Sequence, residues 1–227
     1  MKNRPGRKRG IWAITLLILG VALNGIALAL MVSQFKVHSY EGAAMLPTLP
    51  HGDLVMVKRH PSEVHRGDVV TYDPVGWEGP GPNLGRVVAV GGDHIAYAKG
   101  DRTLTLNGRP LEEPYVLDDA PGAPDLAFAV SVPQGRVFIL GDNRGNSADS
   151  RYYSELQQGT LPVSAVTGLR IAEEDSVLMG VLGLVSSVGT LALPVGIGLG
   201  IAALVARRKK QPVPAGPVWG AVHVDEP

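Results

Sequence analysis

Two uncharged apolar runs bracket this chain, and they limit the folds that are open to it. Residues 11–32 form the first run, of 22 residues, and residues 177–205 form the second, of 29 residues. A helix needs about 20 predominantly apolar residues to cross the hydrocarbon core of a bilayer. Both runs are therefore predicted to be transmembrane helices, which leaves a basic N-terminus (1–10), a middle domain (33–176) and a basic, proline-rich tail (206–227).

The charges that flank the two runs predict their orientation. Five Lys and Arg residues precede the first run, and four follow the second. Under the positive-inside rule both ends of the chain are then cytoplasmic, and residues 33–176 lie outside a plasma membrane that the chain crosses twice. The alternative is a cleaved signal peptide with Ala27-Leu28-Ala29 as its cleavage site, but the apolar run continues to Val32 and is longer than a usual signal core.

Charge and cysteine content restrict the middle domain. Residues 33–176 carry 12 Lys and Arg against 19 Asp and Glu, a net charge of −7. This acidic balance argues against nucleic acid as a partner and is compatible with basic or apolar extended substrates. The chain has no cysteine, so neither a disulfide framework nor a thiol nucleophile is available and stability has to come from a packed core. About 144 residues suffice for one such domain.

The middle domain is predicted to be mainly antiparallel β-sheet. Asn107-Gly108 lies between two apolar stretches and is typical of a two-residue hairpin turn. Apolar periodicity of 3.6 residues is lacking, so little helix is expected. Loops are expected at residues 77–85 and 118–125. Short β-branched runs bounded by Gly and Pro predict strands at residues 54–57, 68–72, 86–90, 94–98, 103–106, 137–140 and 166–171.

Four segments carry a resemblance to a known family. They are GAAMLPTL at residues 42–49, GDVV at 67–70, GRVVAVGGD at 85–93 and GDNRGNSADSR at 141–151. In this order they resemble the type I signal peptidases, membrane serine endopeptidases that cut leader sequences from exported proteins. The resemblance covers about residues 10–176 and implies a folded-over β domain between two transmembrane helices, with a peptide-binding groove on its open face.

The two residues that perform the family's reaction are replaced. The resemblance places the serine nucleophile directly before Met45, where this chain has Ala44, and the lysine general base directly before Arg86, where it has Gly85. A methyl group cannot attack a carbonyl, and glycine offers no group that could take up a proton.

Substitutes for these two residues are weak. Ser39 and Thr48 lie five and four residues from Ala44, too far for a reaction that tolerates little misplacement. The other lysines of the domain are interpreted as a membrane-boundary anchor (Lys36) or as solvated surface (Lys58 and Lys99). His94 is nine residues from Gly85.

The resemblance implies supporting roles for further residues. Ser147 matches the serine that orients the family's lysine, and Asp149 and Arg151 match a supporting ion pair, for which the planar guanidinium is well suited. Asp142, Asn143 and Arg144 match residues that form the loop.

The segment around Ala44 has an additional interpretation. Gly42 and the backbone N–H of Ala44 could form a turn that offers donors to an oxyanion. A purely structural alternative is a tight turn in which Pro47 fixes φ and Thr48 forms a local hydrogen bond. Gly91, where the family usually has proline, suggests a looser turn.

Three hypotheses for function follow from these observations. The favoured one is a catalytically dead relative that binds extended, signal-peptide-like segments or an active signal peptidase at the membrane. The alternatives are an active or weakly active signal peptidase with an unconventional site, and a mutated form of an active enzyme. The six histidines show no ligand spacing typical of a metal site, so neither a metal nor another cofactor is expected.

Overall fold

The computed structural model describes residues 7–74, 76–77, 83–117, 126–171 and 176–208. The chain divides into two compact units, and each is described by itself. One unit consists of residues 1–29 together with 180–227, and the other of residues 30–179.

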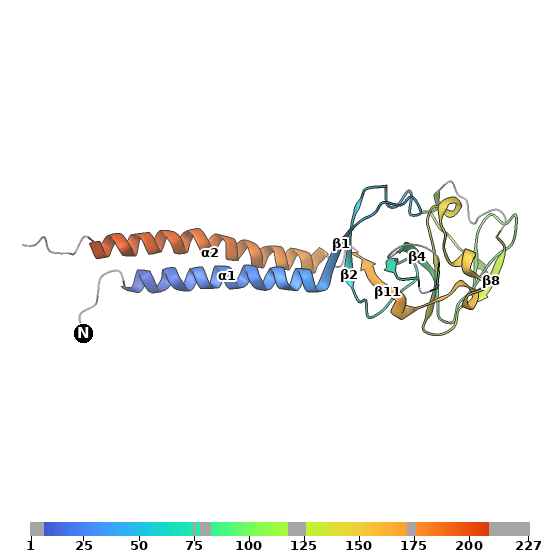
Figure 1. The fold of residues 1–227 in the computed structure, drawn as a ribbon, viewed down its shortest axis with the longest axis horizontal. Helices are drawn as coiled ribbons and strands as arrows, with labels where there is room; N and C mark the ends of the chain where they lie inside the picture. Colours follow the sequence, from blue (N-terminus) through green and yellow to red (C-terminus); the bar gives the residue numbers. More distant parts are fainter. Residues whose placement is uncertain (1–6, 75, 78–82, 118–125, 172–175, 209–227) are drawn as a thin grey trace, which may run out of the picture. The chain divides into compact units, whose positions relative to one another are not determined.

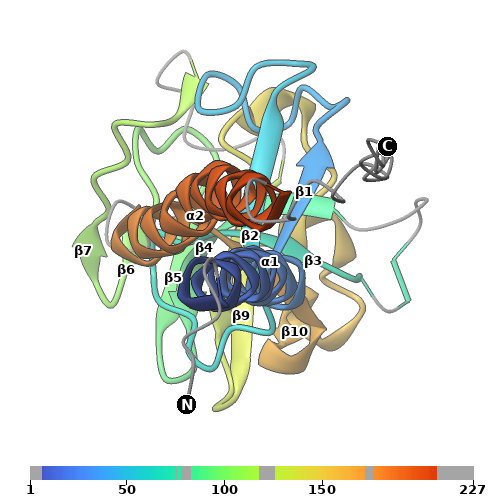
Figure 2. The ribbon, with the colours of Figure 1, turned by 90° about the vertical axis from the view of Figure 1, so that its left-hand side faces the viewer.

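The first unit is a pair of helices. Helix α1 (Arg7–Gln34) and helix α2 (Ser176–Arg208) run side by side (Figures 1 and 2). Their backbones approach closely, because a β-carbon at Gly20 would lie 2.7 Å from the carbonyl oxygen of Gly189. At the same level the Ser186 hydroxyl donates to the Asn24 side-chain oxygen at 2.8 Å. Small residues and an interhelical hydrogen bond are a typical way for helices to associate in lipid.

The second unit is built from two antiparallel sheets, which confirms the predicted fold class. The larger sheet has the strand order β1-β2-β11-β3-β4-β9-β10, and the smaller has the order β7-β6-β5-β8. Between the end of α1 and the start of α2, helix is limited to short 3₁₀ turns within the residues described. The strands are β1 (Phe35–Ser39), β2 (Leu54–Arg59), β3 (Val69–Tyr72), β4 (Asn83–Val90), β5 (His94–Tyr97), β6 (Thr105–Leu106), β7 (Arg109–Pro110), β8 (Phe128–Ser131), β9 (Arg136–Leu140), β10 (Leu161–Pro162) and β11 (Val166–Arg170).

The hairpin predicted at Asn107-Gly108 is confirmed. Strands β6 and β7 pair through Leu106 and Arg109, so the loop has two residues. Both loop residues have positive φ, 52° at Asn107 and 77° at Gly108. A type I′ turn requires this backbone conformation, which glycine and asparagine adopt most readily.

Four strands were not predicted, namely β1, β7, β8 and β10. Strand β1 begins at the residue that follows α1, so its alternating pattern adjoins the apolar run of the helix. Strands β7 and β10 have two residues each, too few for a periodic signal.

The loop predicted at residues 77–85 is wrong at its C-terminal end, where a strand begins at Asn83. Trp77 is buried and stacks on Tyr153 with 4.4 Å between the ring centroids, while Asn83, Leu84 and Gly85 belong to strand β4. The loop predicted at residues 118–125 lies outside the described residues.

Three clusters of buried apolar side chains form the core of this unit. One joins the two sheets, with Phe138 of β9 packed near Ile95 of β5. The cluster that matters most for the site lies beneath the segment between β1 and β2. It contains Tyr40, Met45, Leu49, Val55, Val57 and Val69, with Leu84 packed against it.

Candidate functional site

The segments that the sequence singled out meet at the β1–β2 connection, strand β4 and the loop that follows β9. Asn143 links two of them: its backbone N–H donates to the carbonyl of Ala44 at 2.9 Å, and its side-chain amide donates to the carbonyl of Ala43 at 3.1 Å. Gly141 makes the approach possible, because a β-carbon there would lie 2.6 Å from the Ala44 carbonyl oxygen and would also collide with Ser147 Oγ. Ser147 and Ala44 are therefore neighbours in space.

Tyr40 covers the backbone of the Ala44 segment. Its hydroxyl accepts the backbone N–H of Met45 at 2.9 Å. A β-carbon at Gly42 would lie 2.8 Å from the same hydroxyl, so glycine is needed where the ring passes over the chain. Burial raises the pKa of Tyr40, while the amides of Met45 and Ala44 act in the opposite direction. The N–H of Met45, next to the Ala44 amide that was expected to face an oxyanion, is thus directed at a side chain of the protein itself.

Gly85 lies in a tightly packed place. It is the Cα partner of Val70 in the β3–β4 pairing. A β-carbon at Gly85 would lie 2.5 Å from Cγ2 of Ile139 and 3.2 Å from Cε1 of Tyr72. Both of these side chains are buried. The space that the first carbon of a lysine would need is therefore filled by the core, which the sequence did not reveal.

Asp142 is the centre of a charged network. Arg86 binds it with two hydrogen bonds, Nε to Oδ1 at 2.8 Å and Nη2 to Oδ2 at 2.6 Å. The Thr48 hydroxyl donates to Asp142 Oδ2 at 2.5 Å. The local hydrogen bond expected for Thr48 is therefore wrong, because its partner lies 94 residues further along the chain. The Leu46-Pro47 peptide bond is cis.

Asp149 and Arg151 form a second, fully buried ion pair. Arg151 donates to both carboxylate oxygens at 2.7 Å, and the side chains are 1% and 0% exposed. Asp149 also accepts the backbone N–H of Gly141 at 3.0 Å. Arg151 Nη2 donates to the carbonyl of Arg144 at 2.9 Å. The pair thus holds both ends of the loop that carries Ser147.

A third ion pair involves a residue that the sequence analysis missed. Arg144 donates to Glu113 through Nη2 at 2.5 Å and Nη1 at 3.1 Å, and both side chains are buried. Tyr115 completes the contact: its hydroxyl donates to Glu113 at 2.9 Å, and its ring lies 3.9 Å below the guanidinium carbon of Arg86. Nothing in the local sequence distinguishes Glu113 from Glu112, because the partner is 31 residues away.

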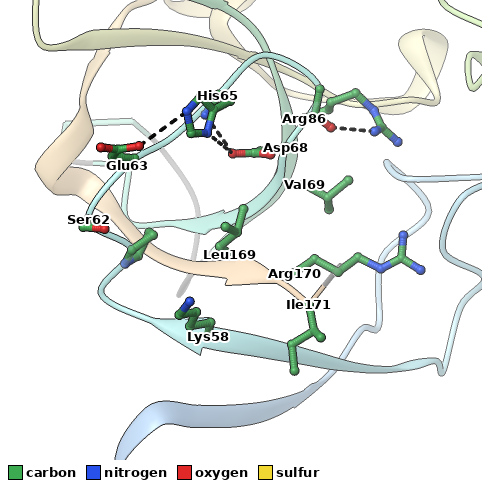
Figure 3. A pocket seen from close by; sticks show the side chains of 12 residues that line it. Lys58, Ser62, Glu63, His65, Asp68, Val69, Arg86, Leu169, Arg170 and Ile171 are labelled. Atoms are coloured by element: carbon green, nitrogen blue, oxygen red, sulfur yellow. Dashed lines mark hydrogen bonds and ion pairs between the residues drawn. The ribbon is translucent and has the colours of Figure 1, made fainter. Parts of the chain in front are cut away.

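A cavity of about 580 Å³ opens beside this network (Figure 3). Arg86 belongs to its wall and donates to the carbonyl of Gly67 at 2.8 Å. His65 also lines the cavity and lies between Glu63, at 3.6 Å, and Asp68, at 4.0 Å (Figure 3). Lys58 and Arg170 contribute cationic side chains from strands β2 and β11.

The residues considered as weaker substitutes for a nucleophile or a base lie elsewhere. Ser39 is exposed and donates to Glu41 at 2.5 Å. His94 is on strand β5 of the smaller sheet, where its ring contacts Ser131 at 3.1 Å. Lys99 lies in an exposed turn, and Lys36 lines a different cavity. Among the described residues, no group of three or more His, Asp or Glu is arranged to hold a metal ion.

The turn at Gly91 is tight, contrary to the looser turn expected. A β-carbon at Gly91 would lie 2.8 Å from the Cα of Gln134. Asp93 pins the same turn by accepting the backbone N–H of Val90 at 2.9 Å and the side-chain amide of Asn107 at 2.9 Å.

The chain is similar to proteins of a known family. The model for "Signal peptidase, peptidase S26" matches residues 12–172. A probable signal peptidase I of Mycobacterium leprae is 29% identical over 73% of this chain and 76% of its own length. Signal peptidase I of Bacillus licheniformis is 34% identical over 56% of this chain and 72% of its own length.

Two further similarities are more partial. Signal peptidase I of Mycobacterium tuberculosis strain H37Rv is 44% identical over 37% of this chain and 33% of its own length. The crystal structure of a signal peptidase I from Enterococcus faecalis matches with a TM-score of 0.38 and 25% identity, over 48% of this chain and 98% of the other. Helices α1 and α2 are both long and apolar enough to cross a membrane, and together with these relatives they indicate membrane association.

Proposed function

Because the chain belongs to the signal peptidase family, peptidase S26, we propose that it is a non-catalytic member that binds extended, signal-peptide-like segments at the membrane. The observation that carries this proposal is the packing at position 85. There the base is missing, and its space is also occupied by Ile139 and Tyr72. A site that had lost only its base would keep the space for it.

The chemistry of acyl transfer supports the same conclusion. The reaction needs a nucleophile, a base that takes up its proton and donors that stabilise the oxyanion. Ala44 has no atom that can attack, Gly85 has none that can accept a proton, and the N–H of Met45 already donates to Tyr40. The nucleophile and the base are both affected and an amide next to Ala44 is occupied, which argues against a single substituted residue in an active enzyme.

The surrounding scaffold supports a role in binding. The loops around Ala44 remain tied by the Arg86–Asp142, Arg144–Glu113 and Asp149–Arg151 ion pairs. Ordered loops next to an apolar cluster can accept an extended peptide, because main-chain hydrogen bonds give affinity and adjacent pockets give specificity. An active signal peptidase in the same membrane is the second kind of partner that such a surface could bind.

The proposal includes a topology. Both ends of the chain are cytoplasmic and residues 33–176 are extracytoplasmic in the plasma membrane, supported by the basic residues outside α1 and α2. Protease added to intact spheroplasts should then digest only the middle domain. Protection of that domain, or release of a soluble form that lacks residues 1–29, would contradict the topology.

The decisive experiment compares cleavage with binding. The purified full-length chain in a nonionic detergent is mixed with a preprotein that carries a small-residue cleavage site, and products are followed by mass spectrometry. Binding of a fluorescent signal peptide is measured by anisotropy. We expect binding without cleavage.

A matched pair of variants tests where the peptide binds. Ala44→Trp should weaken binding, because the half-buried methyl group lies at the centre of the site, whereas Ala129→Trp on exposed strand β8 should not. Cleavage by the unmodified chain would show that it is an enzyme. Equal peptide affinity of the two variants would show that the peptide does not bind at the segment around Ala44.

A further inference from the structure

A cavity of about 320 Å³ lies at the base of the β1–β2 hairpin, and nothing in the proposed function uses it. Lys36 and His38 reach it from β1, and Arg59 reaches it from the end of β2. The register explains this convergence: Lys36 pairs with Val57 and His38 pairs with Val55. Since paired residues share a face and alternate residues of a strand do as well, Arg59 belongs to that same face.

The cavity has an excess of positive charge. Lys36 and Arg59 face one carboxylate, that of the exposed Asp73, and within the described residues neither cation forms an ion pair. Arg59 uses Nε to donate to the carbonyl of Phe35 at 3.3 Å, which fixes its stem and leaves its other donors for a ligand. Burial, Lys36 and Arg59 together lower the pKa of His38.

The chain itself fixes how far this cavity can lie from the end of α1. Lys36 is the second residue after Gln34, the last residue of α1. Two extended residues span at most about 7 Å. If α1 crosses the membrane, as its length and composition allow, the backbone of Lys36 is held at the depth of the lipid headgroups.

We propose that this cavity binds the phosphate group of an anionic phospholipid. The inference rests on α1 as a membrane span and does not depend on whether the site around Ala44 is catalytic. The guanidinium of Arg59 offers a planar set of donors that suits phosphate oxygens, and Lys36 adds a point charge. His60 follows β2 and closes the cavity from the same side, where its backbone N–H donates to the carbonyl of Thr167 at 3.3 Å.

Lipid phosphate and free phosphate share this chemistry, so the experiment must separate them. The full-length chain in a nonionic detergent is titrated with short-chain phosphatidylglycerol, short-chain phosphatidylcholine or inorganic phosphate. Histidine-selective NMR follows His38, whose signal is assigned with His38→Gln. Phosphatidylglycerol should bind most tightly and raise the pKa of His38, because a bound anion counters the two cations.

Variants make the assignment specific. Lys36→Gln combined with Arg59→Gln should weaken the binding of phosphatidylglycerol about 25-fold, at about fivefold for each cation near an anionic headgroup. Asp73→Asn should strengthen binding about fivefold, because it removes the opposing charge. The matched control, Arg102→Gln with Arg109→Gln, changes net charge equally at exposed positions of the small-sheet region and should leave affinity unchanged.

Three results would overturn the proposal. Equal weakening by the control pair would mean that net charge governs binding and that the cavity does not. Inorganic phosphate that binds as tightly as phosphatidylglycerol would remove the lipid assignment. A His38 pKa that does not respond to phosphatidylglycerol would place the headgroup elsewhere.

Discussion

The loop after β9 and the two positions 44 and 85 differ in how firmly their side chains are tied into the folded chain. The loop keeps two buried ion pairs, Asp149–Arg151 and Arg144–Glu113, with carboxylate and guanidinium in bidentate contact. At positions 44 and 85 the chain carries a methyl group and a hydrogen, which can form neither an ion pair nor a side-chain hydrogen bond. The difference follows from what each residue does for the folded state.

A buried charge cannot be lost alone without a large cost. Taking away one partner leaves the other charge in a place from which water is excluded, which costs several kcal/mol. A serine or lysine that serves only the reaction contributes little to stability, and such residues often sit in strained or unfavourable surroundings. In the non-catalytic member that we propose, the scaffold is therefore expected to outlast the catalytic residues.

Arg151→Ala gives the largest expected effect and tests the structural side of this comparison. Asp149 would remain buried without its partner, so the free energy of unfolding should fall by about 3–5 kcal/mol. The measurement is chemical or thermal unfolding of the full chain in detergent. Arg109→Ala, at an exposed position of β7, is the control and should change stability by less than about 0.5 kcal/mol. Equal stability of the two variants would mean that water screens the Asp149–Arg151 pair.

Gly85→Lys combined with Ala44→Ser tests the catalytic side. Restoring both groups should fail to restore cleavage, because the β-carbon at position 85 would lie 2.5 Å from Ile139 Cγ2. Overpacking of this kind destabilises by about 1–3 kcal/mol and displaces the new amine. Residues that act as one catalytic unit tolerate such displacement poorly.

Adding Ile139→Ala to these two substitutions makes the test sharper. The smaller side chain makes room for the stem of the lysine, and cleavage of a preprotein should then become measurable. We expect a rate at least about 10²-fold above that of the double variant. Ala44→Ser with Ile139→Ala, which lacks the base, is the control and should not cleave the preprotein. Cleavage by the variant that carries only Ala44→Ser and Gly85→Lys would show that the core accommodates the lysine without the Ile139→Ala change.

Tyr40→Phe tests whether the Tyr40 hydroxyl occupies a donor that a bound peptide would otherwise use. The N–H of Met45 would lose its acceptor, which should cost about 1 kcal/mol of stability. If the hydroxyl competes with a peptide carbonyl for that donor, the same variant should bind a fluorescent signal peptide more tightly. Tyr97→Phe in the small sheet is a matched control for the loss of a hydroxyl. Unchanged peptide affinity would show that Tyr40 does not compete with the peptide.

The sequence predicted the elements that depend on local patterns. Long apolar runs, β-branched segments and the Asn107-Gly108 turn each carry their own signal, and the structure has helices, strands and a hairpin at these places. The missed features depend on contacts between distant residues. Thr48 bonds Asp142, 94 residues away, and Glu113 bonds Arg144, 31 residues away.

The same reason explains what the sequence did not reveal around Gly85. The resemblance places the family's base at this position, where the chain has glycine. Whether its space had also been filled depended on Ile139 of β9 and Tyr72 of β3, which reach Gly85 only through the sheet. A local motif therefore predicts which reactive group is absent, and the packing shows whether the space for that group is filled.

The smallest effect concerns the pH dependence of stability and compares Tyr72, near Gly85, with Tyr115, near the loop after β9. Burial, with nearby Asp149, raises the pKa of Tyr72 above its usual range, and burial, with Glu113, does the same for Tyr115. A raised pKa in the folded state means that the unfolded chain loses its phenol protons first. The stability that these groups contribute is therefore complete below about pH 10, the pKa of tyrosine in the unfolded chain, and declines as pH rises beyond it.

Tyr72→Phe should change the neutral-pH stability little and flatten this alkaline decline, which unfolding measured from pH 8 to 11 would reveal. A decline as steep as in the unmodified chain would mean that Tyr72 ionises without a folding penalty, and that the packing against Gly85 is looser than its contacts indicate.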